Sequence, residues 1–519
     1  MILEHTDITR DYKETVDVVI IGSGCGGATV GKELAAAGHN VLILERGGYY
    51  TASRGDFDQR SDTMMARIDG SRGLGTSSNG ELSLMYGNCV GGASVHYWGD
   101  SWRLPDDRAQ DYADMGVKHH DSDVLAPHFD RIEKDLNIHI HGPEYFNRMN
   151  QLFDKAAGEL GWHVEGVPQA RKDCTGSGHC FQGCSYDAKQ SQLVTYIPAF
   201  TKAGGRIFAD CHVEKITTDS TGAANGVDAV FLNRETGTPN GYKLRVDAKI
   251  VVLAAGGFAS PLIWLKSGLP NGSGQVGKNL LCNPNPYLYA MFEEKITLWE
   301  NVPAATGTSD FRLAKYDASG AYLEGGYLLH PNQIQPEFLA VTVPGFGAEH
   351  RELMNKLDHL GSVVSWIDDE IGGEIRLSET GEAIYDYTLQ GIDMLKARDA
   401  MKKRAELLFA AGAYDIFVPD LAGTRIKTKA DIALLDTLDL SGGNFLFAAP
   451  HPSSTLCMGE DASKNVVAST HEAHEVPGLF VADPSVFPKG PSVDPSMTIM
   501  AWSYVATQFI QQKLAQRTL

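Results

Sequence analysis

The chain has 519 residues, about three times the length of a typical single domain, so we expect two or more domains or one α/β body with insertions. Hydrophobic residues make up 43% and charged residues 21%, with 55 glycines; this composition is typical of a globular α/β protein and excludes disordered, collagen-like and coiled-coil chains. The formal net charge of −20 disfavours binding to nucleic acids or anionic lipids, because like charges repel.

The N-terminal segment and the hydropathy pattern predict a protein without a membrane anchor. Residues 1–17 are polar and acidic and lack a basic segment followed by an apolar stretch, so we predict no export signal. The longest apolar candidate, residues 250–265, is interrupted by glycines and a proline and predicts a buried strand followed by a helix. We therefore expect a soluble, cytoplasmic protein, or one exported only together with a signal-bearing partner subunit.

The first fifty residues predict a β-α-β unit. The β-branched run at residues 17–21 predicts a strand buried on both faces of a parallel sheet. Residues 28–37 then predict a helix that stops at a glycine, and residues 40–44 predict a second strand.

The turn inside this unit predicts a dinucleotide site. Gly22, Gly24 and Gly27 form the pattern G-x-G-x-x-G, and Glu45 ends the second strand. Glycines at these positions make a tight turn, admit a pyrophosphate and allow close helix packing, while the terminal acid accepts a ribose hydroxyl. Since an acid at this point disfavours a 2′-phosphate, the pattern leaves FAD or NAD.

Five stretches carry a resemblance to a known family. They are residues 87–98 (GNCVGGASVHYW), 249–268 (KIVVLAAGGFASPLIWLKSG), 451–459 (HPSSTLCMG), 478–488 (GLFVADPSVFP) and 492–501 (SVDPSMTIMA). In order and spacing they resemble the glucose–methanol–choline (GMC) family of FAD oxidoreductases, near the long-chain alcohol oxidase and the sugar and polyol dehydrogenase branches. The resemblance covers most of the chain and is weakest between about residues 290 and 450.

The resemblance implies an α/β fold in which a Rossmann-like FAD-binding domain of discontinuous segments adjoins an α+β substrate domain with an antiparallel sheet. It assigns residues 1–140, 200–290 and 450–519 to the FAD-binding domain. It assigns residues 141–199 and 291–449 to the substrate-binding domain and insertions.

Residue patterns are consistent with this organisation. Buried strands predicted at residues 249–254 and 479–483 would return from distant parts of the chain to the sheet begun at the N-terminus. Residues 373–377 predict a strand followed by a glycine turn, and residues 393–411 predict a helix. An acidic run at residues 368–370 is expected to be a solvated turn.

The resemblance also implies which residues bind the cofactor. They would be Gly22, Gly24, Gly27, Glu45, Gly91, Gly92, Ser94, His96, Val213, Asp483 and Thr498. The first four would hold the adenosine diphosphate part, and the 91–94 segment would lie against the flavin and its ribityl chain. His96 stands where some family members attach FAD covalently; an unlinked histidine with a packing role is equally natural there.

Two residues are predicted to perform the chemistry. In the family an alcohol gives its hydroxyl proton to a base and its carbon-bound hydride to flavin N5, and His451 occupies the position of that base. Asp494 stands where the family usually has histidine or asparagine, and we expect this carboxylate to position His451 or a substrate hydroxyl. The predicted activity is oxidation of a small-molecule alcohol to an aldehyde or ketone.

Three cysteines, Cys174, Cys180 and Cys184, lie within eleven positions. Such spacing predicts either ligands of an iron–sulfur cluster or cysteines that only pack. The first alternative resembles the sugar dehydrogenases that pass electrons to a cytochrome, and it implies an electron-acceptor protein as partner. A non-redox flavoprotein of the lyase type, or a binding module that retains FAD only structurally, are further alternatives.

Overall fold

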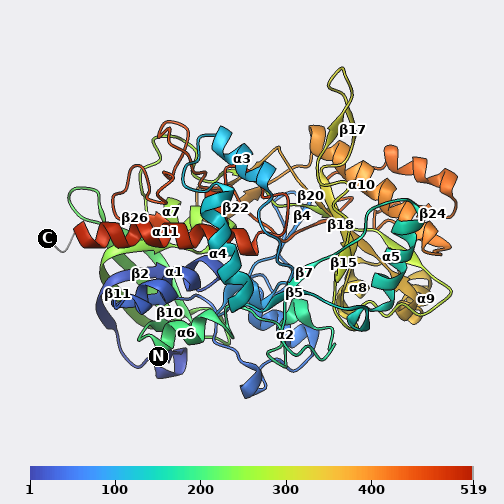
Figure 1. Ribbon diagram of the computed structural model, residues 1–519. Helices are drawn as coiled ribbons and strands as arrows, with labels where there is room; N and C mark the ends of the chain where they lie inside the picture. Colours follow the sequence, from blue (N-terminus) through green and yellow to red (C-terminus); the bar gives the residue numbers. More distant parts are fainter. Residues whose placement is uncertain (517–519) are drawn as a thin grey trace.

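A computed structural model describes residues 1–516 of the chain. Its largest sheet collects strands from distant parts of the sequence (Figure 1). In spatial order the path consists of β1 (Ile2–Leu3), β8 (Arg206–Phe208), β3 (Val41–Leu44), β2 (Tyr12–Ile21), β11 (Pro239–Leu253), β10 (Ala224–Leu232) and β9 (Cys211–Thr218), and β26 (Leu479–Val481) pairs with β11.

The centre of this sheet is parallel and fully buried. β2 pairs in parallel with β3 on one side and with β11 on the other, and Val18, Val19 and Ile20 are 0% exposed. The end of β11 also pairs in parallel with β26, from Val251 opposite Leu479 to Leu253 opposite Val481. The carboxyl ends of three central strands therefore meet at one edge, where ligands of open α/β sheets bind.

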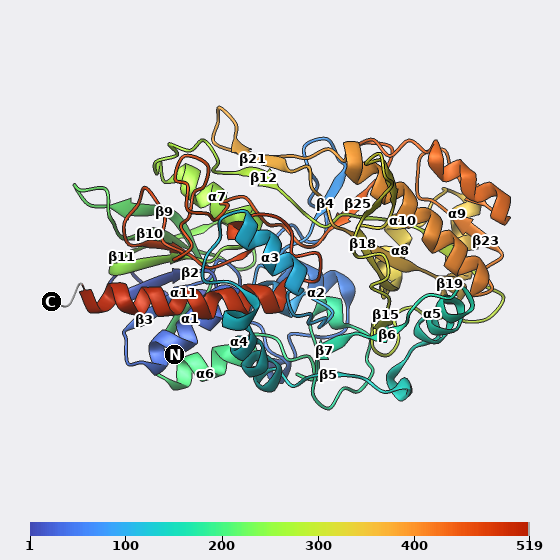
Figure 2. The same ribbon diagram turned by 45° about the horizontal axis from the view of Figure 1, so that its top comes forward.

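Helices cover the sheet, and others build the rest of the molecule. α1 packs against α11 beside the central strands, and α11 crosses one half of the molecule towards the C-terminus (Figures 1 and 2). The α-helices are α1 (Cys25–Ala36), α2 (Ser61–Ile68), α3 (Asp106–Asp114), α4 (Ser122–Asp135), α5 (Arg148–Glu159), α6 (Tyr196–Lys202), α7 (Gly256–Lys266), α8 (Pro336–Thr342), α9 (Ala348–Asn355), α10 (Gly391–Ala410) and α11 (Ser496–Gln516).

A second hydrophobic core lies at the other end of the molecule, where α5, α9 and α10 gather around small sheets (Figure 2). Its pairings are mostly antiparallel, and the longest joins β18 to β20. The main strands here are β4 (Leu82–Leu84), β12 (Lys278–Leu280), β13 (Asn285–Pro286), β14 (Tyr289–Met291), β18 (Tyr327–Pro331), β19 (Leu360–Gly361), β20 (Val363–Ile367), β21 (Gly373–Leu377), β22 (Ala383–Asp386), β23 (Asp415–Phe417), β24 (Arg425–Ile426) and β25 (Phe447–Ala449).

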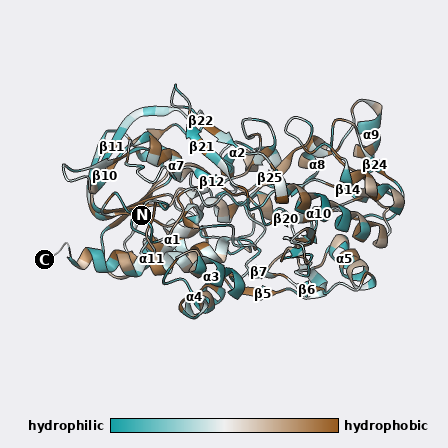
Figure 3. Cartoon of the chain, turned by 90° about the horizontal axis from the view of Figure 1, so that it is seen from above, coloured by the Kyte–Doolittle hydropathy of each residue, from teal (hydrophilic) through white to brown (hydrophobic). Residues whose placement is uncertain are grey.

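The remaining short strands form two-stranded sheets. They are β5 (Ile138–Ile140), β6 (Glu165–Gly166), β7 (Pro168–Ala170), β15 (Thr306–Gly307), β16 (Lys315–Tyr316) and β17 (Tyr322–Glu324). Figure 3 colours the chain by hydropathy and shows α3 as mostly hydrophilic, in keeping with its position outside the sheet. Only Arg108, Ala109 and Tyr112 of this helix are buried.

Most predicted elements are present, with shifted ends. The helix expected at residues 28–37 is α1, which begins three residues earlier, and the helix expected at residues 393–411 is α10. The strand expected at residues 249–254 is the end of the much longer β11. The mixed α/β class and the antiparallel second region agree with the predicted fold, whereas the exact domain boundaries stay a prediction.

Candidate active site

The turn between β2 and α1 brings backbone rather than side chains to the helix N-terminus. Gly22 has φ of +100°, and a Cβ there would lie 2.3 Å from the carbonyl oxygen of Ala254, just after β11. A Cβ on Gly27 would lie 2.1 Å from the Gly22 oxygen, in keeping with its predicted packing role. Gly26, which the sequence did not single out, is tighter: its Cβ would lie 1.6 Å from the oxygen of Ala482, just after β26. These glycines let α1 approach the ends of two central strands, as a pyrophosphate site requires.

The second glycine turn lies against the first. A Cβ on Gly92 would be 2.7 Å from the Cα of Gly24, the residue that caps α1 without a side chain. Gly91, with φ of +98°, donates its N–H to the Ser23 hydroxyl at 3.0 Å. The Ser94 hydroxyl donates to the Gly91 carbonyl at 2.7 Å. The structure therefore brings together the two predicted cofactor loops, which are about 70 residues apart in sequence.

Glu45 directly follows β3, which ends at Leu44, and its carboxylate faces the first glycine turn. One carboxylate oxygen accepts from the N–H and the hydroxyl of Ser23 at 3.0 and 2.7 Å, and the other accepts from the Gly47 N–H at 2.9 Å. Burial raises the pKa of Glu45, and these bonds oppose the shift. The oxygen with a single donor can accept a further hydrogen bond, for example from a ribose hydroxyl. The role of Glu45 in binding the ribose stays a prediction.

His96 is held by groups of its own chain. Its Nδ1 contacts the Phe181 carbonyl oxygen at 2.5 Å, and its Nε2 lies 3.3 Å from Asp69 Oδ2. Burial opposes ionisation of Asp69, but its contact with His96 and the hydrogen bonds from Gly73 and Ser71 together lower the pKa of Asp69 to about 2. Because both ring nitrogens face acceptors, this geometry favours the packing alternative over a covalent flavin link.

The remaining predicted cofactor residues lie around the same sheet edge. Asp483 accepts from the N–H groups of Gly256 and Ser485, both at 2.9 Å, and so joins the start of α7 to the end of β26. Val213 is a buried residue of β9. Thr498, in the first turn of α11, is fully buried, and its hydroxyl has no hydrogen-bond partner within residues 1–516. The unpartnered hydroxyl and the glycine turns fit a bound FAD.

His451 and Asp494 meet as predicted. Asp494 Oδ1 lies 3.5 Å from His451 Nε2, and the side chains are 11% and 14% exposed. Burial, reinforced by the nearby His330, lowers the pKa of His451 to about 3, so the ring is neutral at physiological pH. Burial raises the pKa of Asp494 to about 7. A neutral imidazole beside a carboxyl group can accept a proton and is stabilised once it is charged.

The sequence did not reveal two neighbours of this pair. His330 of β18 and Trp366 of β20 lie beside His451: the Trp366 ring centroid is 5.4 Å from that of His451 and 6.0 Å from that of His330. Asp100 Oδ2 lies 3.8 Å from His330 Nδ1. His330 comes from the part of the chain with the weakest resemblance, whereas Asp100 follows the GGAS motif closely and could have been noticed as an acid beside it.

The acidic run at residues 368–370 was expected to be a solvated turn, but Asp368 and Asp369 are buried and Glu370 is exposed. Asp369 is 2% exposed, and its carboxylate accepts from the backbone N–H groups of Cys282 and Asn283 at 2.9 and 3.0 Å. The Cys282 carbonyl in turn accepts from the backbone N–H of His451 at 3.4 Å. Asp369 thus anchors the segment that supports His451, a role set by partners remote in sequence.

The structure does not support the iron–sulfur cluster. Among residues 1–516, no group of three or more His, Cys, Asp or Glu side chains is placed to hold a metal ion, and this includes Cys174, Cys180 and Cys184. Instead, Arg171 Nη1 lies 3.1 Å from Cys180 Sγ, and Lys189 donates to the Cys180 carbonyl. The physical reason is that Cys180 is engaged by Arg171 and Lys189, and the three cysteines are not placed together around one point.

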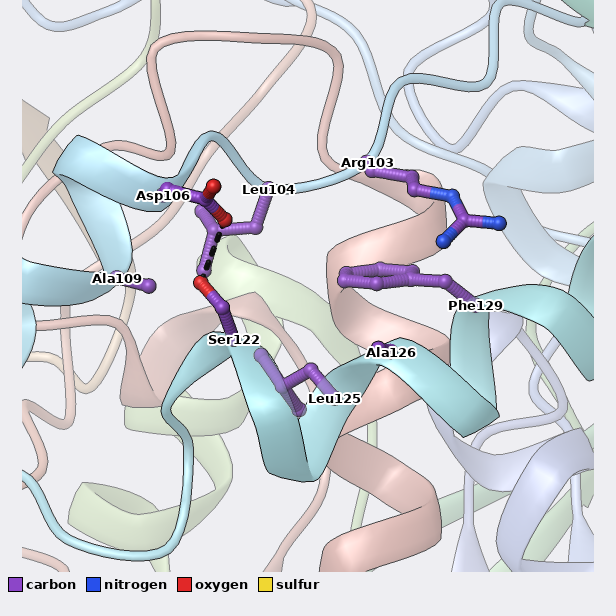
Figure 4. A pocket seen from close by; sticks show the side chains of 8 residues that line it. All are labelled: Arg103, Leu104, Asp106, Ala109, Ser122, Leu125, Ala126 and Phe129. Carbon is purple, nitrogen blue, oxygen red and sulfur yellow. Dashed lines mark hydrogen bonds between the residues drawn. The ribbon is translucent and has the colours of Figure 1, made fainter.

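A small cavity of about 80 Å³ lies away from these residues, between α3 and α4 (Figure 4). Its wall includes the Arg103 side chain and the bond from the Ser122 hydroxyl to Asp106 Oδ1 at 2.6 Å. None of the predicted site residues lines it, so we assign it no role in the chemistry.

The comparisons with known proteins agree with this geometry. One sequence profile of the GMC oxidoreductases matches residues 17–285, and a second profile of the same family matches residues 370–503. The chain is 29% identical to an uncharacterised GMC-type oxidoreductase of Mycobacterium tuberculosis, over 96% of this chain and 77% of the relative. It is 26% identical to the long-chain-alcohol oxidase FAO4B of Arabidopsis thaliana, over 98% and 69% respectively.

The fold is that of a flavin-binding oxidoreductase. The crystal structure of pyridoxine 4-oxidase from Mesorbium loti superposes with a TM-score of 0.70 at 16% identity, over 96% of this chain and 99% of that one. The chain belongs to the GMC oxidoreductase family. The predictions of the family, the fold class and an oxidoreductase acting on CH–OH donors with FAD are therefore confirmed at the level of the family. Within residues 1–516, no helix is long and apolar enough to cross a membrane.

Proposed function

We propose that this protein oxidises a small-molecule alcohol to an aldehyde or ketone, with His451 as the base. The observation that carries the proposal is the buried, neutral His451 with Asp494 Oδ1 at 3.5 Å from its Nε2. We also propose that the core around the large sheet holds FAD while the second core shapes the substrate side. FAD, when bound, supplies the acceptor for the carbon-bound hydrogen and its two electrons.

The protein groups have distinct tasks in this proposal. The glycine turns at residues 22–27 and 91–92, together with Glu45 and Thr498, would hold the cofactor. His451 Nε2 would accept the hydroxyl proton of the alcohol, and the Asp494 carboxylate would stabilise the imidazolium that results. Because burial excludes water, the attraction between the imidazolium and the carboxylate is stronger here than in solution.

The polar groups next to His451 favour a substrate with more than one hydroxyl. Both ring nitrogens of His330, the indole N–H of Trp366 and Asp494 Oδ2 are buried without hydrogen-bond partners in the described part of the chain. Such groups are costly unless a ligand satisfies them, and an all-hydrocarbon substrate would not. The similarity to a long-chain-alcohol oxidase points the other way, so a panel of both kinds of alcohol is the direct test.

The test is anaerobic mixing of the purified flavoprotein with long-chain alcohols, diols and sugars while the flavin absorbance is followed. We expect bleaching by at least one alcohol and a fall of about 10² to 10⁴-fold in its rate in His451→Gln. His163→Gln, which changes an exposed histidine, is the matched control. Bleaching of His451→Gln at the wild-type rate would refute the role of the base. A lyase-type or purely structural flavin would show no bleaching with any alcohol.

Reoxidation is tested separately. Turnover with oxygen as the only acceptor, compared with turnover with an artificial acceptor, shows whether an electron-acceptor partner is needed. If oxygen alone supports full turnover, the acceptor protein implied by the dehydrogenase branch is unnecessary.

A further inference from the structure

A second carboxyl group lies next to the His451–Asp494 pair. Asp100 is 3% exposed, and its Oδ2 lies 3.8 Å from Nδ1 of His330, which is itself 1% exposed. The Ser496 hydroxyl, two residues after Asp494, donates to the Asp100 backbone carbonyl at 3.3 Å and ties the two segments together. Two carboxyl groups and two imidazoles therefore share one enclosed region.

Asp100 is held by a chain of buried polar side chains. Gln169 Nε2 donates to Asp100 Oδ1 at 2.6 Å, and Gln169 Oε1 accepts from Arg171 Nε at 3.0 Å. Gln169 and Arg171 are 0% and 1% exposed. The arrangement fixes the orientation of Asp100, while its second oxygen faces His330.

The surrounding charges determine the ionisation of Asp100. Burial and then the negative charge of Asp494 raise the pKa of Asp100 well above its ordinary value. The Gln169 bond and the charge of Arg171 act in the opposite direction but do not outweigh them. The neighbouring histidines offer no compensating charge, because burial holds the pKa of both His330 and His451 at about 3. Two nearby buried carboxyl groups cannot both ionise cheaply.

We propose that Asp100 is a positioning residue that carries a proton in the resting enzyme, so that Asp494 is the single carboxylate facing His451. The inference rests on the proposed function for its catalytic meaning. Above the pKa of Asp494, the four groups carry one negative charge before the reaction, on Asp494. When His451 takes the hydroxyl proton, the imidazolium and the Asp494 carboxylate neutralise each other, and Asp100 keeps its own proton. The proton lost by the substrate is thus the one gained by His451.

Protonation of Asp100 is measured directly by pH-dependent infrared difference spectroscopy on the oxidised holoenzyme without substrate. We expect a carboxylic-acid C=O band that titrates above the pKa of Asp494, is lost in Asp100→Asn and is kept in Asp114→Asn, which alters an exposed acid at the end of α3. In Asp494→Asn the same band should titrate at lower pH, because the neighbouring negative charge is gone. A band that persists in Asp100→Asn, or an unshifted titration in Asp494→Asn, would overturn the proposal.

The pH profile of anaerobic flavin reduction is the second readout. We expect the wild-type rate to fall on the alkaline side as Asp100 ionises, and Asp100→Asn to lose this fall because an amide cannot ionise. Asp100→Ala, which removes one acceptor of the Gln169 amide group and leaves the Pro303 carbonyl at 2.7 Å as another, should be slower than Asp100→Asn at every pH. An alkaline fall that remains in Asp100→Asn would contradict the proposal. The infrared result needs no substrate, so it stands or fails separately from alcohol oxidation.

Discussion

The contact between α1 and the end of β26 is the tightest feature of the cofactor region, and it makes a quantitative prediction. In Gly26→Ala the new Cβ would lie 1.6 Å from the Ala482 oxygen, less than half an ordinary contact of about 3.5 Å. The oxygen belongs to the backbone of Ala482, and the N–H of Ala482 donates to the Leu253 carbonyl within the sheet, so the oxygen cannot move alone. The whole of α1 must shift, and we expect a loss of about 3 kcal/mol or more in unfolding free energy, the upper range for overpacking.

Two other helical glycines supply matched controls for the same substitution. Gly158 of α5 is exposed, and an added Cβ would meet no atom within 4 Å. Gly158→Ala should therefore stabilise the protein by about 0.5 to 1 kcal/mol, because alanine is the better helix former. Gly31 is intermediate, since its Cβ would lie 3.0 Å from the flexible Cδ1 of Ile43.

The assay is denaturant unfolding of the three variants, with flavin content measured by absorbance after gel filtration. We expect the order of stability Gly158→Ala, then Gly31→Ala, then Gly26→Ala, and we expect flavin loss in Gly26→Ala. If Gly26→Ala were as stable as Gly158→Ala and retained its flavin, the close approach of α1 to β26 would be wrong, and with it the reasoning about the phosphate site.

Two further predictions concern the histidines and their acids. The rate of flavin reduction should fall as the pH drops through about 7, because the Asp494 carboxylate is protonated below its raised pKa and no longer stabilises the imidazolium. In Asp494→Asn the rate should be lower and independent of pH over this range. A fall in rate near pH 7 that survives in Asp494→Asn would argue against the assignment. Acid precipitation should release the flavin into solution, because both His96 nitrogens face Phe181 and Asp69; yellow colour that stays with the pellet would show a covalent link instead.

The sequence determined the local units of this protein. The β2–α1–β3 unit was predicted from a β-branched run, a glycine turn and a short helix, which are patterns local in the chain, although the folded unit also packs against β11 and α11. His451 and Asp494 were found through motifs that the family resemblance supplied, and the structure places them 3.5 Å apart.

Only the tertiary structure decided which distant residues share the site. Asp100 and His330 are 230 positions apart, and no periodicity links them, yet their side chains lie 3.8 Å from each other. Asp369 looked like part of a solvated acidic turn because hydrophilic runs are usually exposed, but remote backbone N–H groups satisfy it in the interior. Cysteine spacing likewise could not show that Arg171 and Lys189 occupy the space beside Cys180. Burial and partners set the chemistry of a polar group, and both arise only when the chain is folded.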